Sequence, residues 1–445
     1  MSHIITELSK YTMVILLALY TYLGFSALRK KCSGKKKRVL EHLQIVYLLL
    51  FHLNANAVLY ISTENTNIIL LYFAELVFFV MLLVFYYNLY PNSSRLIANH
   101  MCMLMAIGFV MLTRLSFETA LKQFAIGFVS MLITLLIPYI IAREKSTFRK
   151  LTALYAIAGI GLLGVVAVLG ATTKGANLSI TIAGITIQPS EFVKIIFVFM
   201  IAGMLYRSTD FLGVVKVSIL AGIHVLILVA SKDLGGALIF FVAYLVMIFV
   251  ATKNPFYFIG GLLGGAAASV VAYHLFAHVR KRVIAWQDPL GHYEVEGNQV
   301  SNSLFAIGTG GWFGMGLNQG TPGRIPEVKK DFIFSAISEE FGGIFAICLI
   351  LVCFSCFLLF LNSSMQMKDK FYQYVALGLG TIYGFQVFLS IGGNIKFIPS
   401  TGVTLPFLSY GGSSLLSSFI IFAVLQGLYL MRYKEGGMRS AEAKK

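Results

Sequence analysis

Residues 67–90 read NIILLYFAELVFFVMLLVFYYNLY, and this stretch decides the class of fold. It holds one charged residue, Glu75, in a run longer than the roughly 20 apolar residues that a helix needs to cross a bilayer. Comparable runs recur along the chain, and we predict thirteen membrane spans, near residues 11–28, 43–62, 67–90, 98–116, 120–142, 152–171, 188–205, 213–231, 235–252, 255–276, 341–361, 371–391 and 410–431. The sequence therefore predicts an all-α polytopic membrane protein.

The composition of the whole chain agrees with this class. Apolar residues make up 58% of the 445 positions and charged residues 12%, against roughly 45–50% and 25% in soluble domains. These values exclude a soluble globular enzyme, a disordered chain and a secreted disulfide scaffold. The net charge of +16 fits the enrichment of Lys and Arg in cytoplasmic loops, so we expect no nucleic-acid partner.

The distribution of basic residues predicts the orientation. Residues 29–38 read RKKCSGKKKR and should be cytoplasmic, where they could also bind anionic membrane lipid. Alternation of the spans then places the loop at Lys145 and the C-terminal tail with Lys444 and Lys445 inside, and the N-terminus outside. The pair Cys353 and Cys356 lies within an apolar run, where helix packing is the expected role rather than metal binding.

Residues 277–340 form the one long loop that we predict, and the alternation places it outside. Its basic run Arg280–Arg282 opposes the usual inside bias, which suggests that these charges face an anion, although they could instead anchor a helix end at lipid headgroups. The Gly-rich stretch 309–323 follows no predicted strand and lacks a Gly-Lys-Ser/Thr sequence, so we exclude nucleotide binding there.

Several ionisable residues lie at the ends of apolar runs, where burial is costly and often marks a site. They are Arg114, Glu191, Lys194, Asp233 and Lys396. Glu191 and Lys194 are three positions apart on one helix and could pair, which by itself would be a structural role. Asp233 precedes the span at 235–252, where Asp is a favourable helix N-cap.

Five sequence stretches, read together, closely resemble the SEDS family of shape, elongation, division and sporulation proteins, which includes FtsW, RodA and SpoVE. In chain order these stretches are residues 188–194, 232–238, 308–317, 331–342 and 399–414. The resemblance covers about residues 98–432 and implies the family's ten-helix core. Residues 1–97 then form an extension of about three additional transmembrane helices, and residues 433–445 form a cytoplasmic tail.

The resemblance implies an enzyme of the bacterial cytoplasmic membrane. The family polymerises lipid II into peptidoglycan glycan strands at the outer membrane face, beside a class B penicillin-binding protein. Its chemistry needs one carboxylate base for the acceptor hydroxyl and inverts the anomeric carbon of an activated diphosphate donor. We expect no required cofactor and no metal site, with a divalent cation as an optional aid at the diphosphate. Two other functions stay open: a scaffold that has lost catalysis, and a lipid II flippase.

The resemblance also implies site residues. Relatives often read W-x-D-P-L-G in the outer loop, which matches residues 286–291 and makes Asp288 the expected catalytic base. The spacing to Gln299 departs from the family, so Glu294 and Glu296 are alternatives, and Asp288 could also be only a turn residue. Lys329 and Lys330 stand where relatives usually have Thr. The expected substrate-binding residues are Glu191, Lys194, Asp233, Gln299, Lys330, Asp331, Glu339, Lys396 and Ser409.

Overall fold

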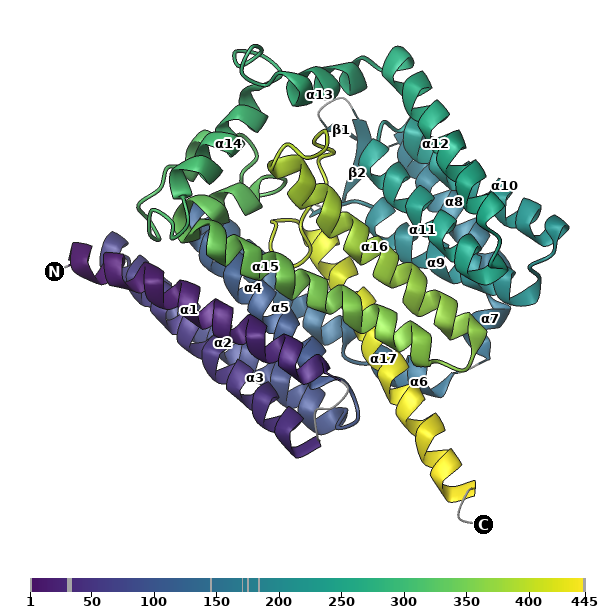
Figure 1. Ribbon diagram of the computed structural model, residues 1–445, viewed down its shortest axis with the longest axis horizontal. Coiled ribbons are helices and arrows are strands. Elements are labelled where there is room, and N and C mark those ends of the chain that lie inside the picture. Colours follow the sequence, from purple (N-terminus) through teal and green to yellow (C-terminus); the bar gives the residue numbers. More distant parts are fainter. Residues whose placement is uncertain are drawn as a thin grey trace. The chain divides into compact units, whose positions relative to one another are not determined.

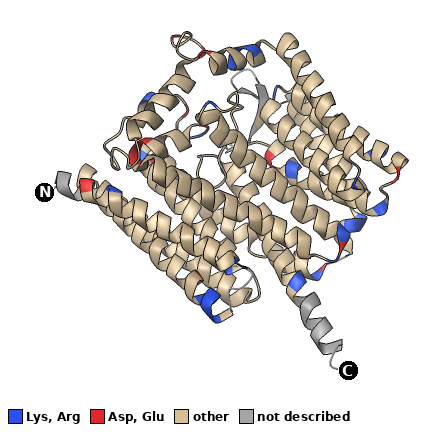
Figure 2. Cartoon of the chain, in the orientation of Figure 1, with Lys and Arg blue, Asp and Glu red and all other residues tan. Residues whose placement is uncertain are grey.

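The computed structural model describes residues 2–29, 34–144, 146–169, 171–173, 176–182 and 185–442. Within these ranges the chain is almost entirely helical (Figure 1). Part of the predicted basic loop at 29–38, together with Lys145, Lys444 and Lys445, lies outside the described residues. Figure 2 shows long stretches of helix that carry no charged residue, as expected for membrane-spanning segments.

The helices have the following bounds: α1 Ser2–Leu28, α2 Gly34–Thr63, α3 Asn67–Leu89, α4 Arg95–Leu115, α5 Phe117–Thr134, α6 Ile137–Arg143, α7 Thr147–Lys150, α8 Thr152–Leu169, α9 Ser190–Arg207, α10 Phe211–Ala230, α11 Leu234–Thr252, α12 Pro255–Leu275, α13 Ala277–Gln287, α14 Asn298–Gly310, α15 Ile333–Gln366, α16 Lys370–Asn394 and α17 Gly412–Glu442. A 3₁₀ turn, η1, covers Pro322–Arg324.

Each predicted span overlaps at least one helix, which confirms the all-α polytopic class. In the described part of the chain, eleven helices are long and apolar enough to cross a membrane. The two predicted spans that fall short are α8, whose apolar part Thr152–Val168 is too short, and α9, which carries three charged residues. The span predicted at 120–142 is divided into α5 and α6 before Pro138, which lacks the amide hydrogen that a continuous helix requires.

Residues 171–187, predicted as a loop, contain a small antiparallel sheet. Its strands are β1 Ala171–Thr173, β2 Ala176–Ile182 and β3 Ile185–Ile187, in the order β1-β2-β3. Ile180 pairs with Ile187 and Ile182 with Ile185. The Thr and Ile residues of this segment are β-branched and favour strands, a local preference that the search for membrane spans overlooked.

The predicted 277–340 loop is also more ordered than expected, because it contains α13, α14 and the start of α15. Helix α15 is interrupted at Gly342, whose backbone has φ 87° and ψ 173°. A short helical segment therefore precedes the kink, and the predicted span at 341–361 begins at it.

The helices form two compact units. The first comprises residues 1–132, 282–356 and 387–411, and the second comprises residues 133–281, 357–386 and 412–445. In the first unit, α1, α2 and α3 pack beside one another and α2 and α3 contact α4, in which every residue from Leu96 to Thr113 is buried. In the second unit, α9 contacts α8, α10, α11 and α17.

Candidate functional site

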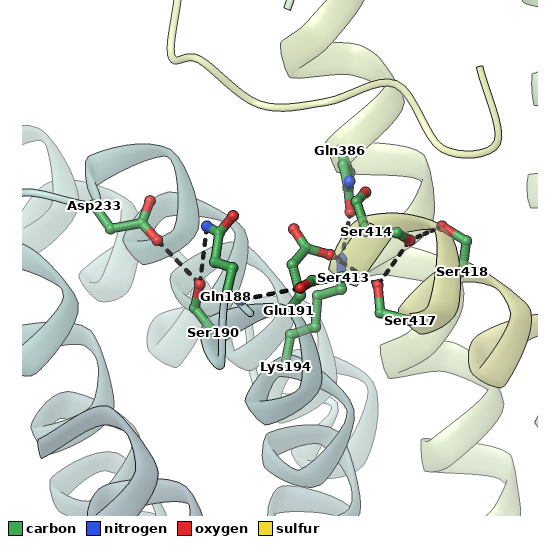
Figure 3. Close-up of polar contacts among 10 residues, drawn as sticks. All are labelled: Gln188, Ser190, Glu191, Lys194, Asp233, Gln386, Ser413, Ser414, Ser417 and Ser418. Atoms are coloured by element: carbon green, nitrogen blue, oxygen red, sulfur yellow. Dashed lines mark hydrogen bonds and ion pairs between the residues drawn. The ribbon is translucent and has the colours of Figure 1, made fainter. Parts of the chain in front are cut away.

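The second unit holds a cluster of polar side chains in the first turn of α9 and around it (Figure 3). We call the polar cluster the set Gln188, Ser190, Glu191, Lys194, Asp233, Gln386, Ser413 and Ser417. Lys194 Nζ lies 2.6 Å from Glu191 Oε2, which confirms the predicted pairing on one helix face. The Lys194 side chain is only 4% exposed, so its charge requires this partner.

Two residues from other helices complete the coordination of this ion pair. Lys194 Nζ donates a second hydrogen bond to Gln386 Oε1 of α16 at 2.8 Å. The Ser417 hydroxyl of α17 donates to Glu191 Oε2 at 2.8 Å. Neither Gln386 nor Ser417 was predicted as a site residue; the only signal was a polar residue inside an apolar run, which is too common to be specific.

Asp233 joins the cluster through its second carboxylate oxygen. Oδ1 accepts from the Gly236 amide at 2.8 Å, which confirms Asp233 as the N-cap of α11. Oδ2 accepts from the Ser190 hydroxyl at 3.3 Å. The backbone amide of Gln188, just before α9, donates to Ser413 Oγ at 3.0 Å. The N-terminal turns of α9, α11 and α17 are thus tied together. Helix N-termini attract anions, and here the carboxylates of Glu191 and Asp233 lie at the N-termini of α9 and α11.

Replacing Asp233 with alanine is expected to lower the free energy of unfolding by about 0.5–2 kcal/mol, because the α11 cap is lost. Asp210 is the matched control: it caps α10 through Gly213 but has no bond to the polar cluster among those described. Thermal unfolding in detergent should show similar losses for both variants. A loss of the polymerising activity that the family resemblance implies, in Asp233→Ala alone, would identify a role of Asp233 beyond capping. Equal activity of the two variants would contradict such a role.

In the first unit, three charged side chains hold the Gly-rich loop, which is the part of the stretch 309–323 that follows the end of α14 at Gly310. We call Arg114, Glu339 and Glu340 the loop clamp. Arg114 Nε lies 2.8 Å from Glu340 Oε1, and an Arg114 Nη2 hydrogen bond reaches the Gly320 carbonyl at 3.0 Å. Glu340 Oε2 accepts from the Asn318 amide at 3.2 Å, and Glu339 Oε1 accepts from the Thr321 amide at 2.9 Å. Glu339, predicted to bind substrate, thus contacts the loop backbone.

The kink at Gly342 is required for the Gly-rich loop to approach α15. A Cβ at Gly342 would lie 2.3 Å from the Gly314 amide nitrogen, and the Gly342 φ is in a region that favours glycine. We expect Gly342→Ala to lower the free energy of unfolding by at least about 1–2 kcal/mol. Gly308→Ala is the control, because a Cβ there meets nothing within 4 Å. Equal melting temperatures for the two variants would contradict this account.

The expected catalytic base, Asp288, directly follows the end of α13 at Gln287. Asp288 is exposed, and its Oδ1 accepts from the Gly291 amide at 2.9 Å, so the side chain does stabilise the predicted turn. Glu294 is also exposed, whereas Glu296 is half-buried. Gln299 lies in the first turn of α14 and is half-buried. All four residues lie in the first unit.

The remaining predicted residues lie near the segment 394–411 of the first unit. Ser409 Oγ donates to the Lys330 carbonyl at 2.5 Å and accepts from the Leu405 amide, so this hydroxyl stabilises its own turn. The Asp331 carbonyl accepts from the Asn394 side chain at 2.8 Å. The Lys396 carbonyl accepts from Trp286 Nε1 at 3.1 Å. Of these contacts, the Ser409–Lys330 bond joins two predicted residues, and it does so through a backbone carbonyl.

Arg282, at the same place, connects α13 to this segment. Its Nη1 donates to the Thr401 carbonyl at 2.9 Å. A Cβ at Gly402 would lie 3.5 Å from Asp331 Oδ2 and 3.6 Å from Arg282 Nη2, so both charged groups approach Gly402. Arg282 belongs to the basic run that the sequence singled out.

Comparison with known proteins shows which family has this architecture. The family model for FtsW, RodA and SpoVE, described as cell cycle protein, matches residues 94–434. The peptidoglycan glycosyltransferase RodA of Mycobacterium bovis is 35% identical over 288 residues, which cover 60% of this chain and 61% of that protein. A probable peptidoglycan glycosyltransferase FtsW of Pseudoalteromonas translucida is 31% identical over 353 residues, covering 73% and 86%. The match thus spans less than two thirds of the mycobacterial relative.

Solved structures share the fold. A chain from a structure described as a peptidoglycan synthase complex, coordinating polymerisation and crosslinking, superposes with a TM-score of 0.65 at 22% identity, covering 77% of this chain and 99% of that one. The rod shape determining protein RodA of Thermus thermophilus superposes with a TM-score of 0.60 at 21% identity, covering 77% and 99%.

Proposed function

Because the chain belongs to the FtsW/RodA/SpoVE family, we propose that it is a peptidoglycan glycosyltransferase that polymerises lipid II into glycan strands. The observation that carries this proposal is the match over residues 94–434 to a family whose relatives include named peptidoglycan glycosyltransferases. The exposed carboxylate of Asp288 is the proton acceptor that we propose for such a reaction.

In the proposed reaction, Asp288 is the general base. Its Oδ1 is held by the Gly291 amide, so Oδ2 takes the proton from the acceptor sugar hydroxyl. The hydroxyl oxygen attacks the anomeric carbon of the donor with inversion, and the bond to the lipid diphosphate breaks. A positioned base contributes about 10²–10⁴-fold to such a step. Glu294 and Glu296 are the alternative bases.

The departing diphosphate needs positive charge, because its negative charge grows as the bond breaks. We assign this role to Arg282 and Lys330, which lie in the same unit as Asp288. Lys194, in the second unit, stays a predicted substrate-binding residue. Glu191, Asp233 and Gln386 set the position of Lys194 and of the N-terminal turns. The donor is already activated, so the reaction requires no nucleotide; a divalent cation would assist only at the diphosphate.

The proposal includes location and partner. We place the N-terminus and residues 277–340 outside the cytoplasmic membrane and the C-terminus inside, on the positive-inside rule. We propose a class B penicillin-binding protein as partner, supported by the similar fold of a chain from a peptidoglycan synthase complex. Residues 1–97 are proposed as an extension to the enzyme core.

The test is glycan polymerisation by the purified full chain on fluorescent lipid II, with its cognate class B penicillin-binding protein and with moenomycin as control. Polymer from the wild type supports the proposal. If the wild type makes no polymer while a family relative does under the same conditions, the proposal that this chain is a glycosyltransferase is wrong. Retained stimulation of the partner's crosslinking would then favour a scaffold.

A further inference from the structure

The three N-terminal helices are joined to the first core helix by buried polar contacts. The Tyr20 hydroxyl of α1 hydrogen-bonds His100 Nδ1 of α4 at 3.0 Å, and His100 Nε2 hydrogen-bonds Ser355 Oγ of α15 at 2.9 Å. All three side chains are essentially inaccessible to solvent. One histidine therefore links the extension to two helices of the region that the family model matches.

A second set of contacts lies beside the first. The Asn99 side-chain amide of α4 donates to Gln44 Oε1 at 3.1 Å and to the Glu41 carbonyl at 2.9 Å, both in α2. The Tyr87 hydroxyl of α3 donates to Asn99 Oδ1 at 2.9 Å. Apolar helices in lipid can slide past one another at small cost, whereas hydrogen bonds between them specify one register.

This register brings the extension against the Gly-rich loop. The Tyr11 ring of α1 lies 5.3 Å from the Phe313 ring, between centroids, and Thr6 Cγ2 lies 3.6 Å from the Cβ position of Gly316. In α2, the Phe51 ring lies 6.1 Å from Phe341 and 5.7 Å from Phe345, the aromatic residues on either side of the Gly342 kink. The extension thus contacts both the Gly-rich loop and α15, the helix whose residues Glu339 and Glu340 bind this loop.

We propose that helices α1–α3 are a built-in positioning element for the Gly-rich loop, with Tyr11 and Phe51 as its positioning residues. The polar contacts of Tyr20 and Asn99 fix the position of α1–α3 along the axis of α4. Tyr11 then restrains the loop directly, and Phe51 restrains the kink from which Glu339 and Glu340 hold the loop. Any effect on catalysis rests on the proposed function, but the positioning itself does not.

The loop offers a direct readout. The Met315 and Gly316 amides donate to the Glu339 and Glu340 carbonyls, each at 2.9 Å, and the Thr321 amide donates to the Glu339 carboxylate. Such amides exchange with solvent deuterium only when the loop opens. Hydrogen exchange of a peptide covering residues 311–321 therefore measures loop opening in the full-length protein, whatever its activity.

The experiment compares Tyr11→Leu and Phe51→Leu with the wild type. We expect the exchange rate of residues 311–321 to rise about 2- to 10-fold in each variant, because each variant loses an aromatic contact and the fold-change corresponds to the usual strength of such a contact. Exchange in α10 and α11 should not change. Tyr22→Leu is the matched control, because Tyr22 lies on the same helix and is 63% exposed, against 43% for Tyr11. This variant should match the wild type.

Unchanged exchange of the loop in both variants would overturn the proposal, and so would an equal rise in all helices, which would indicate general destabilisation. The same proteins are then assayed for polymerisation. If the loop exchange rises but no protein polymerises lipid II, the positioning stands and the proposed function fails. If the wild type polymerises, a change in kcat with the two variants but not with Tyr22→Leu links positioning to catalysis.

Discussion

Replacing Asp288 with asparagine is expected to lower the rate of glycan polymerisation about 10²- to 10⁴-fold, the contribution typical of a general base. Asparagine is the informative replacement because its carbonyl oxygen can still accept the Gly291 amide. The turn that Asp288 Oδ1 stabilises is thereby kept while the proton acceptor is removed. The melting temperature should stay unchanged, so that a loss of activity reports chemistry and not folding.

Glu294→Gln and Glu296→Gln are the parallel variants in the same assay. If Asp288 is the base, both should retain activity within a few-fold of the wild type. The assignment is wrong if Asp288→Asn polymerises normally and one of the glutamine variants is inactive. Normal activity in all three variants would remove the loop carboxylates from the mechanism altogether.

Replacing Lys194 with methionine is expected to lower the free energy of unfolding by about 3–5 kcal/mol, the usual cost of breaking a buried ion pair. Methionine preserves much of the side-chain volume but leaves the Glu191 carboxylate, whose side chain is 14% exposed, without its cation. The bond to Gln386 is lost as well, so the α16 contact loosens. Unfolding in detergent, followed by tryptophan fluorescence or circular dichroism, measures the change.

Lys122→Met is the matched control for this experiment. Lys122 pairs with Glu118 at 2.6 Å, the same distance as in the Glu191–Lys194 pair, but both side chains are more than half exposed. Its loss should leave the melting temperature unchanged. A comparable destabilisation by both substitutions would contradict the importance of burial.

The double variant Glu191→Gln with Lys194→Met separates stability from function. Removing both charges eliminates the uncompensated carboxylate, so much of the lost stability should return. A stable double variant that no longer polymerises lipid II would assign Lys194 to substrate binding. A stable and fully active double variant would show that the pair is structural only.

The class of fold was readable from the sequence because hydropathy is a local property. A run such as 67–90 is too apolar to be exposed to water, whatever its neighbours are, so helices could be placed without knowing their packing. The pairing of Glu191 with Lys194 was equally local, since a spacing of three puts both on one helix face. The same holds for Asp233 as a cap and for Asp288 as a turn residue.

Contacts between distant segments could not be predicted in this way. Glu75 had no assigned partner in the sequence, yet its Oε2 lies 2.7 Å from His52 Nε2 between two buried faces of α2 and α3. Ser417 and Glu191 are 226 positions apart, as are Arg114 and Glu340. Which helices become neighbours depends on the summed packing of whole surfaces, and a single residue's type carries almost none of that information.

The sequence by itself thus determined eleven of the membrane-spanning helices, the Asp233 cap and the residues worth testing. Only the tertiary structure decided that the Ser409 hydroxyl stabilises its own turn, that the loop clamp holds the Gly-rich loop, and that the N-terminal helices contact this loop. The physical reason is that a helix or a cap depends on a few neighbouring residues. A binding site instead depends on polar groups that the fold brings into an apolar interior, where each must find a partner.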